Sequence, residues 1–126
     1  MIINRREFSG AAALILVAGC AGTLKGAKRV EEAYGLIGEM IAAPGKRAEL
    51  IAILAAGTRD MPGNIAYLIA EDLANPDSIW ITEVWSTRTD HANSLKLPAV
   101  QAAIASARPL LGGFGKRIET RPLIID

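Results

Sequence analysis

Three segments of this chain are apolar at nearly every position, and they limit the fold more than any other feature of the sequence. They are Tyr34–Ala42 (YGLIGEMIA), Asn64–Leu73 (NIAYLIAEDL) and Ile79–Trp85 (IWITEVW). Alternate side chains of a β-strand point to opposite faces of its sheet, so strands of this composition place apolar groups on both faces. Such strands are typical of a sheet that is buried on two sides.

Two helical patterns accompany these strands, one between the first and the second strand and one after the third. The first begins at Lys46, after the turn at residues 43–45 (APG), and ends before residues 61–63 (MPG). The second follows the third strand in two pieces, Arg88–Leu95 and Pro98–Arg108. The predicted core stripes are Leu50, Ile53, Leu54 and Gly57 in the first helix and Val100, Ile104, Ala107 and Leu111 in the second. Four basic residues are predicted to lie on solvated surfaces: Lys46, Arg47, Lys116 and Arg117.

The last predicted strand, Phe114–Thr120, carries Lys116, Arg117 and Glu119 and so has the polar character of an edge strand. The order of elements is therefore β-α-β-β-α-β. With right-handed crossovers, this order gives a four-stranded antiparallel sheet with both helices on one face. The sequence predicts an α+β fold of this kind, the ferredoxin-like plait.

This plait leaves one face of its sheet without helices, although three of its strands are apolar on both faces. The resulting apolar patch would be larger than monomeric proteins usually expose. Burial of such a patch stabilises by about 25 cal/mol per Å², and a second copy of the chain is the simplest source of another sheet. We therefore expect a homodimer in which two sheets pack face to face.

The segment Ile79–Val100 gathers the groups best suited to chemistry. Its strand ends in Trp85, and the hydroxyl of Ser86 or Thr87 can cap the following helix. That helix carries His91, the only histidine of the chain. Because a strand end and the next helix start lie close together, we expect the indole and the imidazole in one neighbourhood.

Composition argues against several classes of function. The chain has 14 Lys and Arg against 13 Asp and Glu, and 12 of each remain without Arg5, Arg6 and Glu7, so it lacks the basic excess of nucleic-acid-binding proteins. A single cysteine, Cys20, and a single histidine argue against disulfides and metal sites. The glycines at 112–115 follow a helix, which is the wrong context for a nucleotide loop. An enzyme of this composition is expected to work without a metal, a nucleotide cofactor or a covalent nucleophile.

The first residues have the pattern of an export signal. Arg5 and Arg6 are followed by Phe8 and by an apolar run shorter than the roughly 20 residues that span a bilayer. The run ends in small residues before Cys20, a pattern that resembles a lipobox. The predicted division is a twin-arginine signal peptide over residues 1–19, a tether over 20–33 and the folded domain over 34–126.

Two other interpretations of this segment stay open: an ordinary cleavable signal with an incidental cysteine, and an N-terminal helix buried against the domain. If Cys20 is lipidated with a diacylglycerol and an N-acyl chain, the anchor is stable, since one chain alone binds a membrane only marginally. The protein is then expected to be exported and held outside the cytoplasm, with its lipid anchor as its contact with the membrane.

Five short motifs together resemble one known family. They are Tyr34-Gly35-Leu36-Ile37-Gly38, Pro44-Gly45-Lys46-Arg47, Met61-Pro62-Gly63, Glu83-Val84-Trp85 with His91 six places on, and Leu97-Pro98-Ala99-Val100. Over about Tyr34 to Arg121 the chain resembles the antibiotic biosynthesis monooxygenase domain, and within it the group named for quinol monooxygenases. The resemblance implies a dimeric α+β barrel that oxidises electron-rich phenols or quinols with O₂ and without metal or flavin, in a pocket between sheet and helices.

The resemblance also places residues in that pocket. Trp85 matches the pocket tryptophan of the anthrone-oxidising members, and His91 falls where those members carry a tyrosine. Their pocket asparagine corresponds to Ile81, and the position of their helical arginine is taken by Ile104. Haem-degrading relatives need an asparagine on the first strand and a histidine farther along the helix, and this sequence has neither.

His91 and Trp85 are the predicted catalytic residues. An imidazole titrates near pH 6.5, so His91 could take the proton of a phenol, or it could simply bond to a neighbouring group. Trp85 could form a wall of the pocket and bind a substrate oxygen through its indole N–H, or it could pack as core. Glu83, on the same face of the strand, needs a partner: Arg88, Arg108 or an orienting contact with His91.

Three further residues complete the predicted pocket. Tyr67 and Met40 could line it with Ile81, although core packing is the favoured explanation of both. Trp80, on the opposite face of its strand, is predicted to lie in the dimer core.

Three functions are consistent with this sequence. The first is an exported, cofactor-independent monooxygenase that acts on a quinol or another electron-rich aromatic compound. The second is a dimeric module that binds a small apolar ligand without turnover. The third is an isomerase or degradative enzyme for a small carbonyl compound, which would form product without consuming oxygen.

Overall fold

The computed structural model describes residues 32–123, so the predicted signal peptide, Cys20 and nearly all of the predicted tether lie outside the described residues. The elements, in order, are β1 (Tyr34–Ala42), α2 (Arg47–Gly57), β2 (Asn64–Glu71), β3 (Ser78–Trp85), α3 (Arg88–Ser94), α4 (Pro98–Ala107), the 3-10 turn η3 (Arg108–Leu110) and β4 (Leu111–Thr120). The strands form one sheet in the order β2-β3-β1-β4 with antiparallel neighbours. This is the predicted ferredoxin-like plait.

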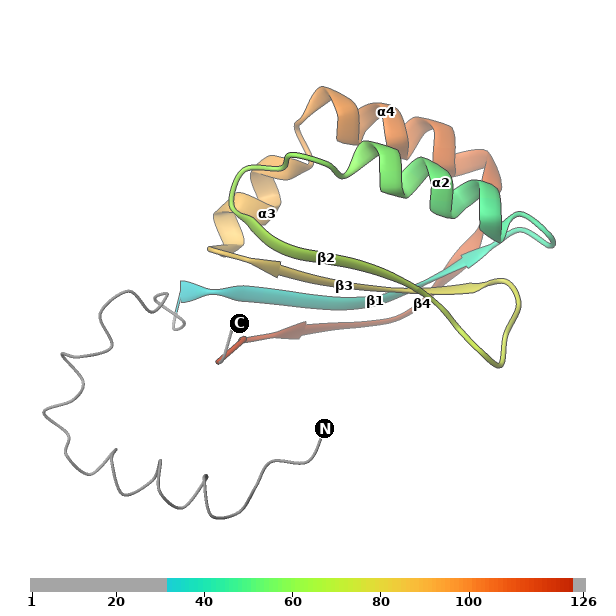
Figure 1. Cartoon of the computed structure of the whole chain (residues 1–126), viewed down its shortest axis with the longest axis horizontal. Helices are drawn as coiled ribbons and strands as arrows, with labels where there is room; N and C mark the ends of the chain where they lie inside the picture. The colour runs from blue at the N-terminus through green and yellow to red at the C-terminus, as the bar shows by residue number, and fades with distance from the viewer. Residues whose placement is uncertain (1–31, 124–126) are drawn as a thin grey trace, which may run out of the picture.

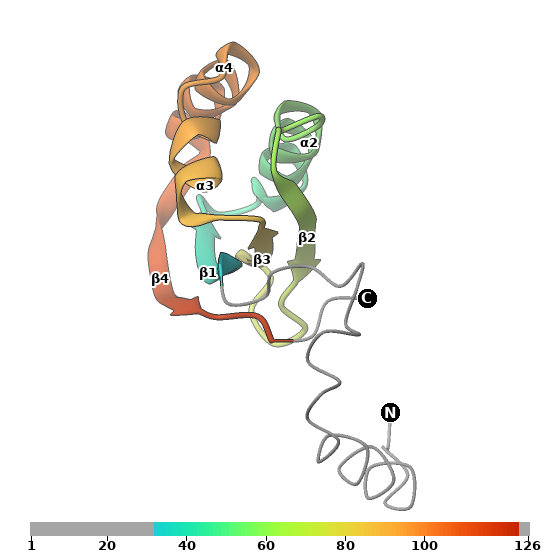
Figure 2. The same cartoon turned by 90° about the vertical axis from the view of Figure 1, so that its left-hand side faces the viewer.

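All described helices lie on one face of the sheet (Figure 1). The turned view shows the same arrangement, with β4 at one edge of the sheet and β2 at the other (Figure 2). We refer to the covered face as the helix side and to the opposite face as the outer face.

Two buried clusters form the core between sheet and helices. One gathers side chains of α2, β1, β3 and α4: Ala42, Leu50, Leu54, Ile79, Ile81 and Ala107. The other lies toward α3 and the start of α4: Tyr34, Leu36, Met61, Trp85 and Val100. Tyr67 packs against both clusters. The core stripe predicted for the first helix is confirmed, because Leu50, Leu54 and Gly57 are buried and Ile53 packs against the core.

The core stripe predicted for the second helix was wrong at Ile104. The buried residues of α4 are Val100, Ala103 and Ala107, and Ile104 is 40% exposed. Gly57 of α2 lies so close to Ala103 that a Cβ added there would come within 2.3 Å of the Ala103 Cβ. These two small residues let the helices approach closely. Ile104 follows Ala103 on α4 and is turned from it by about 100°, so its side chain points away from that contact.

Three other expectations need correction. Leu111 belongs to β4, which begins three residues before the predicted Phe114 because the chain leaves η3 directly into the sheet. β2 ends at Glu71, because the Oδ1 atom of Asp72 accepts hydrogen bonds from the backbone N–H groups of Ala74 and Asn75 in the following turn. Arg47 is not a solvated side chain, because its guanidinium donates to the carbonyl oxygens of that turn.

A row of side chains that crosses the outer face is apolar on β2, β1 and β4, with a threonine on β3. Leu68 of β2 stands opposite Thr82 of β3, Thr82 opposite Ile37 of β1, and Ile37 opposite Ile118 of β4. Leu68 is 59% exposed and Ile118 is 51% exposed. No helix of residues 32–123 covers this row, so its apolar side chains are open to a partner (Figure 2).

Candidate functional site

A pocket of about 310 Å³ lies on the helix side of the sheet, over β3, β1 and β4. We call it the apolar pocket, because apolar atoms form most of its surface, although four of its ten lining residues carry charged side chains. Its lining residues are Leu36, Gly38, Glu39, Met40, Ile81, Glu83, Phe114, Gly115, Lys116 and Arg117.

The apolar pocket exists because Gly38 has no side chain. Gly38 stands between Ile81 of β3 and Arg117 of β4 in one row across the sheet. Residues opposite each other in a ladder share a face, so a side chain at position 38 would project into the space between its two neighbours. The nearest atom to a Cβ built at Gly38 is the carbonyl oxygen of Lys116, 4.0 Å away. The position therefore has room for a side chain, and that room is part of the pocket.

Glu83 places a carboxylate in this apolar wall. Its side chain is only 13% exposed. The indole Nε1 of Trp85 donates to Glu83 Oε2 at 2.8 Å, and His91 Nε2 lies 3.8 Å from the same oxygen. Trp85 and His91, which do not line the pocket, thus position the Glu83 carboxylate that does.

Local structure explains how these three side chains meet. Glu83 and Trp85 are two apart on β3 and therefore share its helix side. Thr87 caps α3, accepting a hydrogen bond from the backbone N–H of Asp90 at 3.0 Å, so the prediction of a cap at this position is confirmed. The cap fixes the first turn of α3, which brings His91 over the end of β3.

The buried setting shifts two pKa values upward. Burial raises the pKa of Glu83 above the usual glutamate range, although the Trp85 hydrogen bond and the nearby His91 and Arg117 lower it in part. Burial, and then the charge of Glu83, raise the pKa of Tyr67 well above its ordinary value. Tyr67 stands directly opposite Glu83 on β2, and its phenol therefore stays neutral beside the carboxylate.

Aromatic rings enclose His91 on its other sides. Its ring centroid lies 5.5 Å from that of Trp85, in an edge-to-face arrangement, and 5.3 Å from that of Tyr34. Trp85 is 1% exposed and Tyr34 is 4% exposed. These contacts fix the imidazole in one position against Glu83.

The predicted site residues fall into three groups. Met40, Ile81 and Glu83 line the apolar pocket. Trp85, His91 and Tyr67 lie behind it and reach it through Glu83. Ile104 is half-exposed on α4 and does not line this pocket.

The expected partner of Trp85 turns out differently, whereas of the three partners predicted for Glu83 the structure shows His91. The indole N–H of Trp85 is engaged by Glu83, so in this arrangement it does not face a substrate oxygen. Glu83 pairs with neither Arg88 nor Arg108: Arg88 donates to Glu119 at 2.8 Å, and the contact of Glu83 is with His91.

Seven of the ten residues that line the pocket were not predicted from the sequence, and three of them shape it most. Gly38 and Phe114 carried no signal of their own, and Arg117 was predicted to lie on a solvated surface. All three are brought together by the pairing of β1 with β4, in which Gly38 opposes Arg117 and Met40 opposes Phe114. That register includes irregular steps, at Gly38/Met40 and Ile41/Ala42, which a strand pattern does not indicate.

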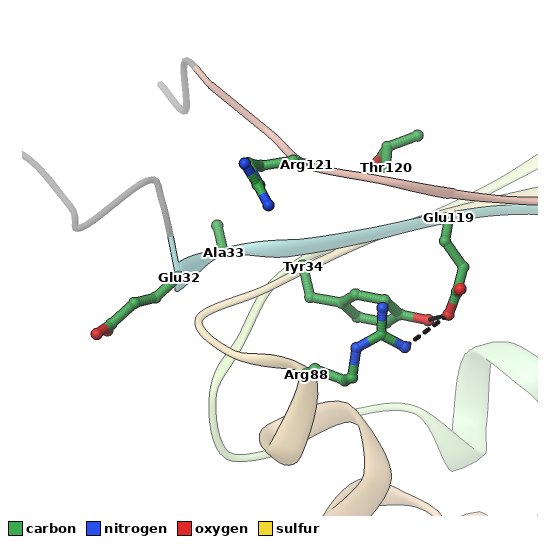
Figure 3. A pocket seen from close by; sticks show the side chains of 7 residues that line it. All are labelled: Glu32, Ala33, Tyr34, Arg88, Glu119, Thr120 and Arg121. Carbon is green, nitrogen blue, oxygen red and sulfur yellow. Dashed lines mark hydrogen bonds and ion pairs between the residues drawn. The ribbon is translucent and has the colours of Figure 1, made fainter.

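A second pocket, of about 360 Å³, lies at the start of β1 and the end of β4 (Figure 3). We call it the polar pocket; its lining residues are Glu32, Ala33, Tyr34, Arg88, Glu119, Thr120 and Arg121. The Tyr34 hydroxyl donates to Glu119 Oε2 at 2.5 Å, and the Arg88 guanidinium lies 4.5 Å from the Tyr34 ring centroid. Hydrogen bonds from Tyr34 and Arg88 lower the pKa of Glu119.

Among residues 32–123, no three His, Cys, Asp or Glu side chains are grouped so that they could hold a metal ion. Within the same residues, no helix has both the length and the apolar character needed to cross a membrane.

Comparisons with known proteins agree with this architecture. The sequence model of the family described as antibiotic biosynthesis monooxygenase matches residues 33–106. A crystal structure from Chloroflexus aurantiacus, whose name assigns it to the same monooxygenases, is 50% identical, with a TM-score of 0.73 over 75% of this chain and 96% of that chain. A search of curated proteins found no match.

More distant structures share the fold. A Bacteroides thetaiotaomicron protein, also named for antibiotic biosynthesis monooxygenases, is 17% identical, with a TM-score of 0.67 over 75% of this chain and 93% of that chain. A Mycobacterium tuberculosis protein is 21% identical, with a TM-score of 0.63 over 74% of this chain and 97% of that chain.

Proposed function

The chain belongs to the antibiotic biosynthesis monooxygenase family, and we propose that it oxidises an electron-rich phenol or quinol with O₂ in the apolar pocket. One observation carries this proposal: Glu83 presents a carboxylate to an apolar hollow of about 310 Å³. Ligand sites of small molecules typically combine such apolar walls with few, well-placed polar groups.

Proton transfer to Glu83 is the step that this geometry supports best. A base is most effective when its pKa lies near the working pH, and burial raises the pKa of Glu83 in that direction. Removal of the phenolic proton leaves a phenolate, which transfers an electron to O₂ more readily than the neutral phenol. The protein's part in this step is to position the hydroxyl and accept its proton.

We assign Trp85 and His91 to the support of Glu83. The Trp85 N–H stabilises the charged carboxylate, and His91, 3.8 Å from it, can take up the proton that Glu83 has accepted. His91, the base predicted from the sequence, thus accepts the proton second, after Glu83. In this proposal Met40 lines the pocket and Tyr67 packs beside Glu83.

Oxygen consumption tests the proposal. An oxygen electrode with a panel of reduced hydroquinones should show uptake above the autoxidation rate. The Glu83→Gln variant should lose about 10²- to 10⁴-fold in rate, the usual contribution of a positioned base. Glu49→Gln, the same change at an exposed helix position, is the matched control.

Two outcomes would replace this function with another. Ligand binding without oxygen uptake, unaffected by Glu83→Gln, would identify a binding module. Product formation without oxygen uptake would identify an isomerase or degradative enzyme that acts on a carbonyl compound.

We further propose that the protein works as a homodimer joined at the outer faces of two sheets. The cross-sheet row of Leu68, Thr82, Ile37 and Ile118 supports this, because Leu68 and Ile118 are exposed at its two ends and Ile37 is only partly buried between them. Light scattering of the purified protein should give twice the chain mass, and Leu68→Lys should shift it toward the monomer. A monomeric wild-type protein would contradict the dimer.

Export with a lipid on Cys20 remains a proposal based on the sequence of residues 1–20. Mass spectrometry of the protein extracted from membranes should find a chain that begins at a lipidated Cys20. Cys20→Ala should release the protein from the membrane, and an unprocessed N-terminus would contradict the proposal.

A further inference from the structure

Arg117 brings a cation to the rim of the apolar pocket. It stands on β4 directly opposite Gly38, so no side chain of β1 separates its guanidinium from the hollow. Its side chain is 58% exposed. The position is thus open both to the pocket and to solvent.

The guanidinium has hydrogen-bonding capacity to spare. Its nearest anion is Glu119, with 3.9 Å between Arg117 Nη1 and Glu119 Oε2, a distance too long for a hydrogen bond. That oxygen already accepts hydrogen bonds from Tyr34 and Arg88. Among residues 32–123, Arg117 donates no hydrogen bond, although a guanidinium carries five N–H donors in a fork that matches a carboxylate.

Glu83 and Arg117 lie on opposite sides of the same hollow. Their strands, β3 and β4, flank β1, so the two backbones are separated by two strand spacings, about 10 Å. Leu36 and Met40 provide apolar surface between them. A volume of about 310 Å³ is at the small end for ligand sites, which suits a ligand of one or two rings.

The rim also offers an aromatic surface. Phe114 lines the pocket from β4 and is 71% exposed, so its ring is available to stack against a planar ligand. Glu39, which also lines the pocket, accepts a hydrogen bond from the Ser78 hydroxyl, whereas the charge of Arg117 acts on Glu83.

We propose that the apolar pocket selects a small aromatic acid, with its phenolic hydroxyl at Glu83 and its carboxylate on Arg117. The reaction of this ligand rests on the proposed function, but its binding does not. A carboxylate paired with the Arg117 fork supplies a charge-assisted hydrogen bond that a neutral ring lacks.

Binding of an unreactive pair of ligands tests the proposal. Titration calorimetry with the full chain would compare 4-hydroxybenzoate with its methyl ester, which keeps the ring and hydroxyl and removes the charge. The acid should bind about tenfold more tightly, the effect of one charge-assisted hydrogen bond. Arg117→Gln should abolish that preference by weakening the acid alone, and Arg117→Lys should restore part of it.

Arg59→Gln provides the control, because it removes the same charge from an exposed position after α2. It should leave the binding of both ligands unchanged. Circular dichroism of each variant would show that the fold is kept. The proposal is overturned if the ester binds as tightly as the acid, if Arg117→Gln weakens both ligands alike, or if neither ligand binds.

Oxygen uptake with 2,5-dihydroxybenzoate and its methyl ester separates this inference from the proposed function. Arg117-dependent binding of the acid without oxygen uptake would leave the inference standing and contradict the monooxygenase. Oxygen uptake that is equal for acid and ester and insensitive to Arg117→Gln would support the monooxygenase and overturn the inference.

Discussion

The two pockets of this domain are similar in volume and opposite in chemistry. The apolar pocket, about 310 Å³, has a buried carboxylate, Glu83, beside the apolar side chains of Leu36, Met40 and Ile81. The polar pocket, about 360 Å³, has a carboxylate, Glu119, that accepts from both a phenol and a guanidinium (Figure 3). Size alone therefore does not identify the reactive site.

The two carboxylates differ in what surrounds them. Burial raises the pKa of Glu83, whereas the hydrogen bonds of Tyr34 and Arg88 lower the pKa of Glu119. A carboxylate with a raised pKa accepts a proton readily at working pH, and one with a lowered pKa does not. The comparison favours the apolar pocket for the proposed proton transfer, whereas Glu119 in the polar pocket links β4 to Tyr34 and Arg88.

After the loss of the base itself in Glu83→Gln, the largest effect is expected when the apolar pocket is filled. Gly38→Val adds three carbons inside the pocket, where the nearest atom to the new Cβ is 4.0 Å away. The fold should therefore be kept while the ligand is displaced. We expect oxygen uptake to fall by about 100-fold, as when a substrate is held 1 Å out of place. Gly113→Val, on β4 but outside the pocket and with no atom within 4 Å of its added Cβ, is the control. Equal rates for both variants would place the reaction elsewhere.

The next effect concerns the support of Glu83. Trp85→Phe removes the hydrogen bond that lowers the pKa of Glu83, so this pKa should rise further and the acidic limb of the pH–rate profile should move to higher pH. Trp80→Phe is a matched control, because it removes a similar indole bond, 2.8 Å to Asp72, on the outer face. An unmoved profile in Trp85→Phe would show that Glu83 is not the base that limits the rate.

Stability should depend on pH in opposite directions at the two carboxylates. Because the pKa of Glu83 is raised by folding, its contribution is fully present below the usual glutamate range and lost as pH rises through its folded pKa. The pKa of Glu119 is lowered, so its contribution is present above the usual range and lost as pH falls through its folded pKa.

Urea unfolding over a range of pH would measure this difference. The stability of Glu83→Gln relative to wild type should rise with pH above the usual glutamate range. The stability of Glu119→Gln relative to wild type should rise as pH falls below that range. Slopes of the same sign for both variants would contradict the contrast between the two pockets.

The smallest effect on activity is expected in the polar pocket. Arg88→Gln breaks the 2.8 Å contact with Glu119 and the stacking over Tyr34, both at an exposed side chain. Since exposed ion pairs contribute little, oxygen uptake should stay within about twofold of wild type. A large loss of activity would show that the polar pocket takes part in the reaction.

The fold could be predicted because its signals are local. Strands that are apolar on both faces, and turns with Pro and Gly, can be recognised within short segments. The order of these elements then predicts the plait without knowledge of any tertiary contact. The stripe of α4 was misjudged at Ile104, since the side that faces the core is set by the close approach of Ala103 to Gly57, a tertiary contact.

The site could be predicted only in part. Glu83, Trp85 and His91 lie near one another in sequence, so a strand and the next helix suffice to bring them together. Gly38 and Arg117 are 79 positions apart and meet through a strand register with irregular steps. A single glycine such as Gly38 also gives no pattern in a sequence. Its space can be recognised as part of a pocket only when the residues opposite it in the sheet are known.

The most direct test is an NMR titration of the side-chain carboxyl carbons of Glu83 and Glu119 with 4-hydroxybenzoate. Binding in the apolar pocket predicts that the Glu83 signal moves with ligand concentration and that its pKa changes, while the pKa of Glu119 stays where it was. A ligand that binds and shifts the pKa of Glu119, with Glu83 unmoved, would contradict the assignment of the reactive site to the apolar pocket.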